Sequence, residues 1–194
     1  MWGASSVVSS AVSVVGPGVT PSDGNLPPVP RRITHRATWD APAETVYAEL
    51  VDADHLRERL AELGGNDPAL LEHAVDDSGA RLRLRHSVPV EFLPSVVRRF
   101  TGDDLVLDRH ETWTPRAGGG YDGTFEVTVR GLPGTMSGTQ RLSDNGGGAV
   151  SEVDGQATVS VPMVGGKIEG VVVEQVGNLL DAEDAFTRRR LARG

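Results

Sequence analysis

Residues 105–113 combine side chains that could do chemistry with the alternating pattern of a β-strand. Because successive side chains of a strand point to opposite faces of its sheet, Arg109 and Glu111 share one face. The same face carries the apolar side chains of Leu105, Leu107 and Trp113. If this face points into the protein, a guanidinium and a carboxylate lie in or beside an interior cavity. Two interpretations follow: the pair orients a polar ligand group or takes part in acid–base chemistry, or it is a salt bridge that satisfies two buried charges.

His86 is a second candidate for chemistry. It shares one face of another strand-like segment with Leu82, Leu84 and Val88. A histidine in a mostly apolar cavity can act as a base or donate a hydrogen bond to a ligand. The alternative is a partly buried histidine that is hydrogen-bonded within the protein. The other histidines do not combine with nearby carboxylates at a metal-ligand spacing, so we predict no metal site.

We predict no catalytic residues and no cofactor. The chain contains no cysteine, which excludes thiolate nucleophiles, disulfides and cysteine-based metal sites. It has no Gly-x-Ser-x-Gly nucleophile turn. The segment Gly165-Gly166-Lys167 lacks the first glycine of a phosphate-binding loop and the Ser or Thr that follows its lysine.

Composition excludes several classes of partner. The net charge of −8 argues against nucleic acid and against an anionic membrane surface. No apolar stretch approaches the roughly 20 residues that span a bilayer, so we predict no integral membrane association and a cytoplasmic protein. A chain of 194 residues fits one domain with a substantial core.

The elements that must position these side chains follow from periodicity. Residues 32–39 alternate as a strand, and two short helices follow: one begins near the predicted N-cap Asp40, and one covers residues 53–63 with Asp54 as N-cap. Strands are then expected over residues 70–75, 80–88, 105–114, 121–130, 135–142 and 149–161, with a short helical turn within residues 89–100. Turn-prone glycines between these strands indicate an antiparallel meander.

Residues 165–194 form one long amphipathic helix in this prediction. Its apolar residues recur at steps of three and four and are Ile168, Val171, Val172, Val176, Leu179, Leu180 and Phe186. Such a stripe needs a sheet to cover it. Gln175 and Glu183 interrupt the stripe. A polar residue on the inner face of such a helix can orient a ligand. The alternative is that Gln175 bonds to a strand side chain or to water and that Glu183 pairs with an arginine near the drier end of the sheet. We predict that Gln175 faces a pocket and leave both interpretations of Glu183 open.

Residues 1–30 differ in composition from the rest of the chain. Ser, Ala and Val dominate the first half of this segment, and Pro and Gly dominate the second half. We predict an extension without fixed structure, the alternative being a short β-prone segment that packs on the domain. The domain itself is predicted to cover residues 31–194.

The order of these elements and one local motif resemble a known superfamily. Residues 33–47 read ITHRATWDAPAETVY, a strand followed by an Ala-Pro-x-x-x-Val-aromatic helix start. This resembles the START-like (Bet v 1-like, SRPBCC) superfamily of polyketide cyclases and lipid-transfer proteins. More narrowly, the chain looks like an uncharacterised bacterial branch of it from high-GC Gram-positive genomes. The resemblance covers about residues 31–193.

The resemblance implies an α+β helix-grip fold. In this fold a curved antiparallel sheet, here of about six to seven strands, grips a long C-terminal helix, with two short helices beside it and a cavity in between. Members bind lipids, sterols, polyketides or other apolar molecules, and a minority are cyclases, aromatases or hydroxylase components. The superfamily has no shared catalytic motif that could be carried over to this chain.

The leading hypothesis is therefore non-catalytic binding of a hydrophobic small molecule or lipid under the last helix. The predicted ligand-binding residues are Leu84, His86, Arg109, Glu111, Trp113, Phe125, Val127, Val172, Gln175 and Leu179. A second hypothesis is a cyclase or aromatase in which Arg109, Glu111 and His86 converge in an open cavity. A third is a co-chaperone-like interaction module with a collapsed cavity and an exposed apolar patch.

Overall fold

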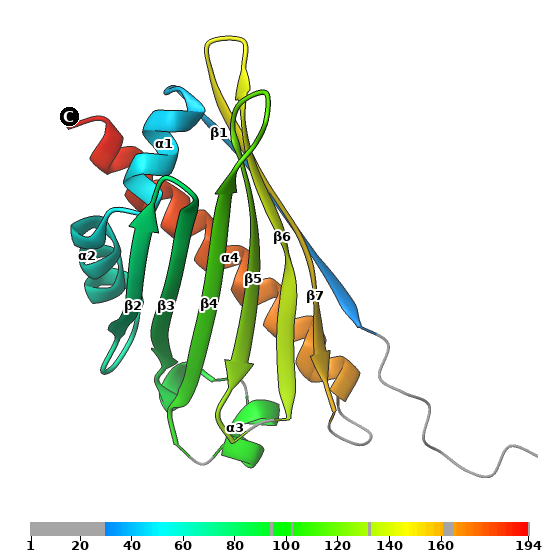
Figure 1. The fold of residues 1–194 in the computed structure, drawn as a ribbon. Helices are drawn as coiled ribbons and strands as arrows, with labels where there is room; N and C mark the ends of the chain where they lie inside the picture. Colours follow the sequence, from blue (N-terminus) through cyan, green and yellow to red (C-terminus); the bar gives the residue numbers. More distant parts are fainter. Residues whose placement is uncertain (1–29, 94, 102, 132, 161–164, 194) are drawn as a thin grey trace, which may run out of the picture.

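One curved antiparallel sheet wraps around a long helix (Figure 1). The computed structural model describes residues 30–193 except positions 94, 102, 132 and 161–164. The extension predicted for residues 1–30 thus lies outside the described residues, apart from Pro30. None of the helices in the described part of the chain has both the length and the apolar character of a membrane span.

The predicted helix-grip architecture is confirmed, with seven strands in the order β1-β7-β6-β5-β4-β3-β2. The strands are β1 (Arg31–Trp39), β2 (Ala69–Asp76), β3 (Gly79–Val88), β4 (Leu105–Pro115), β5 (Tyr121–Val129), β6 (Gly134–Asn145) and β7 (Gly148–Val159). The helices are α1 (Ala43–Leu50), α2 (Ala53–Leu63), the 3-10 turn η1 (Val90–Phe92), α3 (Ser95–Thr101) and α4 (Gly165–Leu191). β2 to β7 form a meander, and β1 closes its far edge by pairing with β7.

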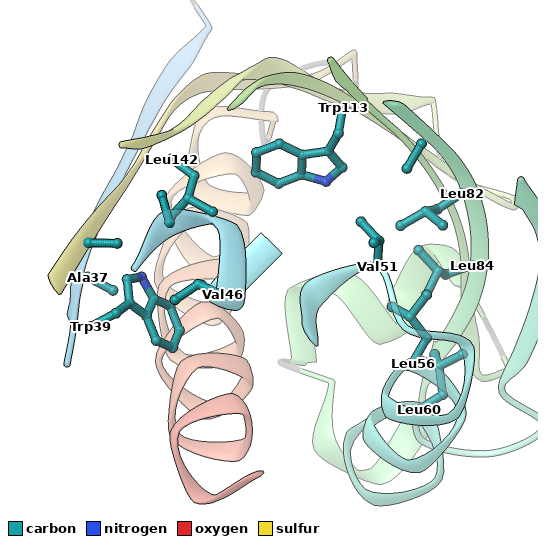
Figure 2. Close-up of a cluster of buried hydrophobic side chains, with 13 residues drawn as sticks. Ala37, Trp39, Val46, Val51, Leu56, Leu60, Leu82, Leu84, Trp113 and Leu142 are labelled. Atoms are coloured by element: carbon teal, nitrogen blue, oxygen red, sulfur yellow. The ribbon is translucent and has the colours of Figure 1, made fainter. Parts of the chain in front are cut away.

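The helices α1 and α2 cover one end of the inner face of the sheet and build the largest buried cluster (Figure 2). Val46 of α1 and Leu56 of α2 are almost fully buried against strand residues such as Leu84 and Leu142. Tyr47 extends this contact outward, because its ring stacks on that of Tyr121 at 3.6 Å between centroids. This end of the sheet is therefore closed by side chains.

Both predicted N-caps are wrong. Asp40 does not cap α1: the N-cap position is Pro42, and the Ala43 N–H instead donates to Asp144 Oδ1 at 2.7 Å. That carboxylate comes from β6, so a tertiary contact satisfies a donor that a local side chain usually satisfies. In α2 the cap is Asp52 and not Asp54.

Two inner-face glycines make room for one aromatic ring. Phe125 on β5 lies opposite Gly138 on β6, which in turn pairs with Gly155 on β7. A Cβ atom on Gly138 would lie 2.8 Å from Phe125 Cε1, and one on Gly155 would lie 2.6 Å from Phe125 Cζ. The ring thus covers both glycines, and these positions add no side chain of their own to the space beneath α4.

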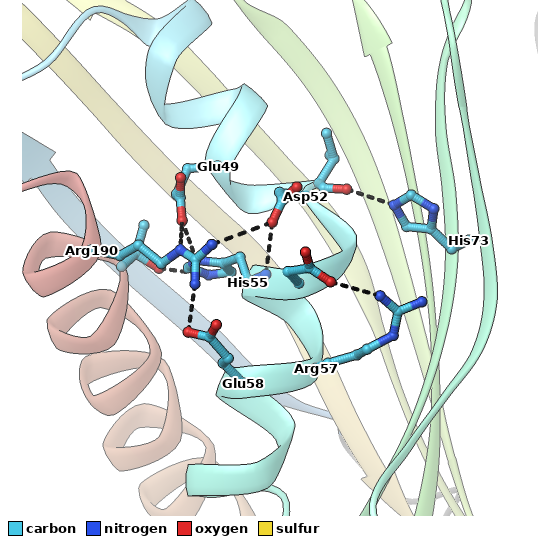
Figure 3. Close-up of polar contacts among 10 residues, drawn as sticks. Glu49, Asp52, His55, Arg57, Glu58, His73 and Arg190 are labelled. Atoms are coloured by element: carbon cyan, nitrogen blue, oxygen red, sulfur yellow. Dashed lines mark hydrogen bonds and ion pairs between the residues drawn. The ribbon is translucent and has the colours of Figure 1, made fainter. Parts of the chain in front are cut away.

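The C-terminal end of α4 is bound to α1 and α2 by ion pairs (Figure 3). Arg190 lies 2.6 Å from Glu49 Oε1 and 2.5 Å from Glu58 Oε2. His55, which is fully buried, donates from Nδ1 to the same Glu49 carboxylate at 2.8 Å. These contacts fix the last turns of the helix.

Two glycines within α4, Gly170 and Gly177, are not required by close packing. A Cβ atom on Gly170 or Gly177 would meet no neighbouring atom within 4 Å. Because glycine in a helix interior costs about 0.5–1 kcal/mol relative to alanine, Gly170→Ala and Gly177→Ala should each raise the free energy of unfolding by that amount. Urea denaturation measures the change.

Gly138→Ala is the control for this prediction. Its Cβ would lie 2.3 Å from the Asp154 carbonyl oxygen, so this variant should lose stability. A loss of stability in all three variants would contradict the packing described for α4.

Candidate functional site

A cavity of about 400 Å³ lies between the inner face of the sheet and α4. Its walls are mainly apolar and come from the strands, from the segment that contains η1 and α3, and from α4. Examples of the apolar wall are Leu105, Val127, Met136, Val159, Ile168 and Val172. The polar side chains in the lining include His86, Ser87, Arg109, Gln140, Gln175 and Asn178.

The cavity exists because α4 is supported at one edge and at one end. The helix packs on β1 and β7 along one side of the sheet and on α1 and α2 at its C-terminal end. Between these supports it crosses the concave face, and Val171, Val172 and Val176 are only half-buried there. These three valines line the cavity, so a bound molecule could cover the apolar surface that they leave exposed.

Seven of the ten predicted ligand-binding residues line this cavity: His86, Arg109, Phe125, Val127, Val172, Gln175 and Leu179. Gln175 lies exposed on α4 and still borders the cavity. Contact with a ligand stays a prediction for all seven.

Leu84 and Trp113 do not line the cavity, which corrects their predicted position. Both share the inner face with the cavity residues, but α1 and α2 cover that part of the face. Leu84 is completely buried in the α1–α2 cluster, and the Trp113 ring packs edge-on against Tyr47 at 6.2 Å. α2 ends at Leu63, so His86, two residues beyond Leu84 on β3, reaches the open space.

Glu111 is also absent from the lining, because its carboxylate turns towards other polar groups. Its Oε1 lies 2.5 Å from Arg109 Nε, and its Oε2 accepts a long hydrogen bond of 3.4 Å from Gln140 Nε2. Arg109 in turn donates from one terminal nitrogen to both oxygens of Glu183 on α4, at 3.0 and 3.1 Å. The salt-bridge interpretation of Arg109 and Glu111 therefore matches the observed geometry, and Glu183 is paired with an arginine, one of the two alternatives considered for it.

Arg59 completes this network of four buried charges. Its Nε lies 3.8 Å from Glu183 Oε1, and the Arg59 side chain is 6% exposed. We name Arg59, Arg109, Glu111 and Glu183 the buried charge network. It joins α2, β4 and α4, and its formal charges cancel.

Burial and charge pairing act against each other within the network. Burial opposes the charge on Arg109, but Glu111 and Glu183 outweigh it, so the pKa of Arg109 is raised. Burial also favours the neutral form of Glu183, yet Arg109 and Arg59 hold its pKa down to about 2. Glu183 is therefore ionised over the whole physiological pH range.

His86 is a buried polar group of the cavity that lacks a hydrogen-bond partner among the described residues. The residue is 7% exposed, and among the described residues neither ring nitrogen has a hydrogen-bond partner. Burial lowers its pKa to about 4; Glu183 and Glu111 act against burial, whereas Arg109 and Arg59 add to it, so the imidazole is neutral at pH 7. The alternative predicted from the sequence, a His86 that is hydrogen-bonded within the protein, is therefore not observed among the described residues.

Sequence reasoning missed Arg59 and Gln140. The position of each residue in the sequence pattern could have indicated that its side chain points inward. Arg59 falls on the apolar stripe of α2, three residues after Leu56 and four before Leu63, where a charge needs a buried partner. Gln140 shares the inward face of β6 with Met136.

The three groups required by the enzyme hypothesis do not converge in the cavity. Arg109 and His86 reach it, but Glu111 is buried behind Arg109. Within residues 30–193 as described, no group of three His, Asp or Glu side chains has an arrangement that could hold a metal ion.

Replacement of Arg109 tests the network. Arg109→Met would leave Glu111 and Glu183 buried without their main partner, so we expect a loss of about 3–5 kcal/mol in the free energy of unfolding. Arg32→Met is the matched control: Arg32 also pairs with a carboxylate from a strand, Asp154 at 2.6 Å, but both side chains are exposed. Urea denaturation should show little change for the control, and equal losses in both variants would contradict a buried network.

Replacement of His86 tests its protonation state. The pKa falls from an ordinary 6.5 to about 4 in the fold, so between these values the unfolded chain binds more protons and stability decreases as the pH falls. This contributes up to about 3 kcal/mol of pH dependence. His86→Leu should flatten the stability profile between pH 6.5 and 4, and a profile identical to that of the wild type would refute a buried neutral imidazole.

Solved structures similar to this chain include one bacterial and one human protein. A START superfamily protein from Mycobacterium smegmatis is 15% identical, with a TM-score of 0.48, and the match covers 82% of this chain and 98% of that one. Human STARD10 is 16% identical, with a TM-score of 0.49, and the match covers 81% of this chain and 62% of that one.

Relatives in sequence lead to the family. An uncharacterized protein of Mycobacterium tuberculosis is 28% identical over 167 residues, which cover 82% of this chain and 95% of the relative. The predicted resemblance to uncharacterised bacterial proteins is thus confirmed. Residues 34–191 match the family described as "Protein of unknown function (DUF2505)", and the chain belongs to this family.

Proposed function

We propose that this chain binds a mainly apolar small molecule in the cavity under α4, without catalysis. The observation that carries the proposal is the cavity itself, with its apolar walls and a polar region at His86 and Arg109. Small-molecule sites in proteins commonly combine these features, since apolar burial supplies affinity and a few polar groups set the orientation of the ligand.

The apolar walls form two buried clusters joined by one residue of α4. One cluster contains Leu105, Val159 and Ile168, and the other is built around Val127 and Met136. Val172 packs against both. A ligand under Val172 therefore contacts both clusters, and each Å² of apolar surface that it covers contributes about 25 cal/mol.

The volume limits the size of the ligand. About 400 Å³ lies in the lower part of the range of roughly 300–1,000 Å³ that is common for small-molecule sites. A single-chain lipid or a compact ring compound fits this volume. We retain the predictions of a cytoplasmic location and of no nucleic-acid partner.

The interaction-module hypothesis is less well supported. It requires a collapsed cavity and an exposed apolar patch, whereas the cavity is open and the large exposed apolar side chains among the described residues are Leu71 and Val75 of β2. Two such side chains do not make a patch of several hundred Å².

Filling the cavity tests the proposal. Val172→Trp places an indole in the space between the two apolar clusters, so it should abolish binding of a neutral apolar fluorophore such as N-phenylnaphthylamine. Val75→Trp adds the same side chain on β2, at a position that is 43% exposed and outside the cavity, and should leave binding unchanged. Fluorescence titration gives the affinity, and circular dichroism confirms that both variants fold.

Native mass spectrometry of the full chain provides an independent readout. Wild-type protein should retain an apolar compound that the Val172→Trp variant lacks. If the fluorophore binds both tryptophan variants and wild type equally, its site lies elsewhere and the proposal is wrong.

A further inference from the structure

We infer that the polar end of the ligand is an uncharged hydroxyl or carbonyl group that hydrogen-bonds to His86, and not a carboxylate or an ammonium group. The inference rests on the proposed binding function and adds the chemical class of the ligand. Three features of the cavity carry it: an unpartnered imidazole, a cancelled charge, and the prior engagement of neighbouring polar groups.

The imidazole of His86 is built into the wall of the cavity without a partner. It is 7% exposed, it lines the cavity, and neither Nδ1 nor Nε2 has a hydrogen-bond partner among the described residues. A buried polar group without a partner costs about 1–3 kcal/mol. A ligand group that reaches His86 removes this cost, which makes the residue the natural anchor of the cavity.

The charges that face His86 cancel. Arg59 and Arg109 favour the neutral imidazole, and Glu111 and Glu183 oppose them. The positive charge of Arg109 is already neutralised, because its guanidinium is paired with Glu111 at 2.5 Å and with Glu183 at 3.0 Å. A carboxylate in the cavity would therefore be buried next to a network that is already neutral.

Burying such an unpaired charge is costly, and the cost applies to either sign. An ammonium group would meet Glu111 and Glu183, whose negative charges are already paired with Arg109. A neutral imidazole instead offers one donor and one acceptor. A hydroxyl group complements both, and a carbonyl group accepts from the donor.

Two other polar side chains of the cavity lining, Ser87 and Gln140, are already hydrogen-bonded. Ser87 Oγ donates to the Asn66 carbonyl oxygen, and Gln140 Nε2 donates to Glu111. Gln175 lies on the exposed side of the cavity, on α4. These groups carry no charge, so the polar lining outside the network also favours a neutral ligand.

Three ligands with the same chain and different ends test the inference: decanol, decanoate and decylammonium. Each is titrated into the full chain at neutral pH against bound N-phenylnaphthylamine. Decanol should displace the fluorophore at roughly tenfold lower concentration than either ion. In His86→Leu, the affinity for decanol relative to that for the fluorophore, each measured in the variant, should fall by roughly three- to tenfold, the usual value of one hydrogen bond.

Two further variants separate the loss of the His86 hydrogen bond from nonspecific effects of replacing a histidine. His86→Gln keeps a donor and an acceptor and should restore part of the affinity for decanol. His110→Leu removes an exposed histidine from the outer face of β4 and should change nothing.

The outcomes distinguish this inference from the proposed function. If the fluorophore binds but decanoate is preferred, the neutral class is wrong and the binding function stands. An unchanged affinity for decanol relative to the fluorophore in His86→Leu would overturn the anchor alone. If neither the fluorophore nor any of the three ligands binds, the proposed function itself fails.

Discussion

The buried charge network of Arg59, Arg109, Glu111 and Glu183 is the constraint on which the rest of the structure depends. It joins α2, β4 and α4 in a region where an unpaired charge is not tolerated. Loss of any one member would therefore leave a buried charge without its partner and weaken the docking of α4. Apolar packing alone could let α4 slide along the sheet, whereas the carboxylate of Glu183 holds it at one register, between Arg109 and Arg59.

The network also marks the boundary between a filled core and an open cavity. On one side, α1 and α2 close the sheet with side chains such as Leu84 and Trp113. On the other side, α4 leaves the sheet uncovered between its supports, and Phe125 lies flat over two glycines. The cavity is thus a consequence of where the helices end. Its polar end is neutral because the network beside it is balanced.

The sequence predicted the element order well, since strand alternation and turn glycines are local signals. Each strand lies within three residues of its predicted ends. Alternation also placed Arg109 on the inner face correctly. Strand alternation does not indicate which part of the inner face α1 and α2 cover. Leu84 and Trp113 are therefore predicted to line the cavity, although they lie under these two helices. The cap of α1 was beyond local reasoning, because Asp144 comes from a strand 101 residues away.

The most direct test of this account is a crystal structure of the full chain with an ω-brominated decanol bound. We expect the hydroxyl group within hydrogen-bond distance of the His86 ring and the anomalous bromine peak among the apolar side chains around Val127, Met136 and Ile168. A bromine peak beside Arg109, a peak on the outer face of the sheet, or an empty cavity at saturating ligand would contradict the account.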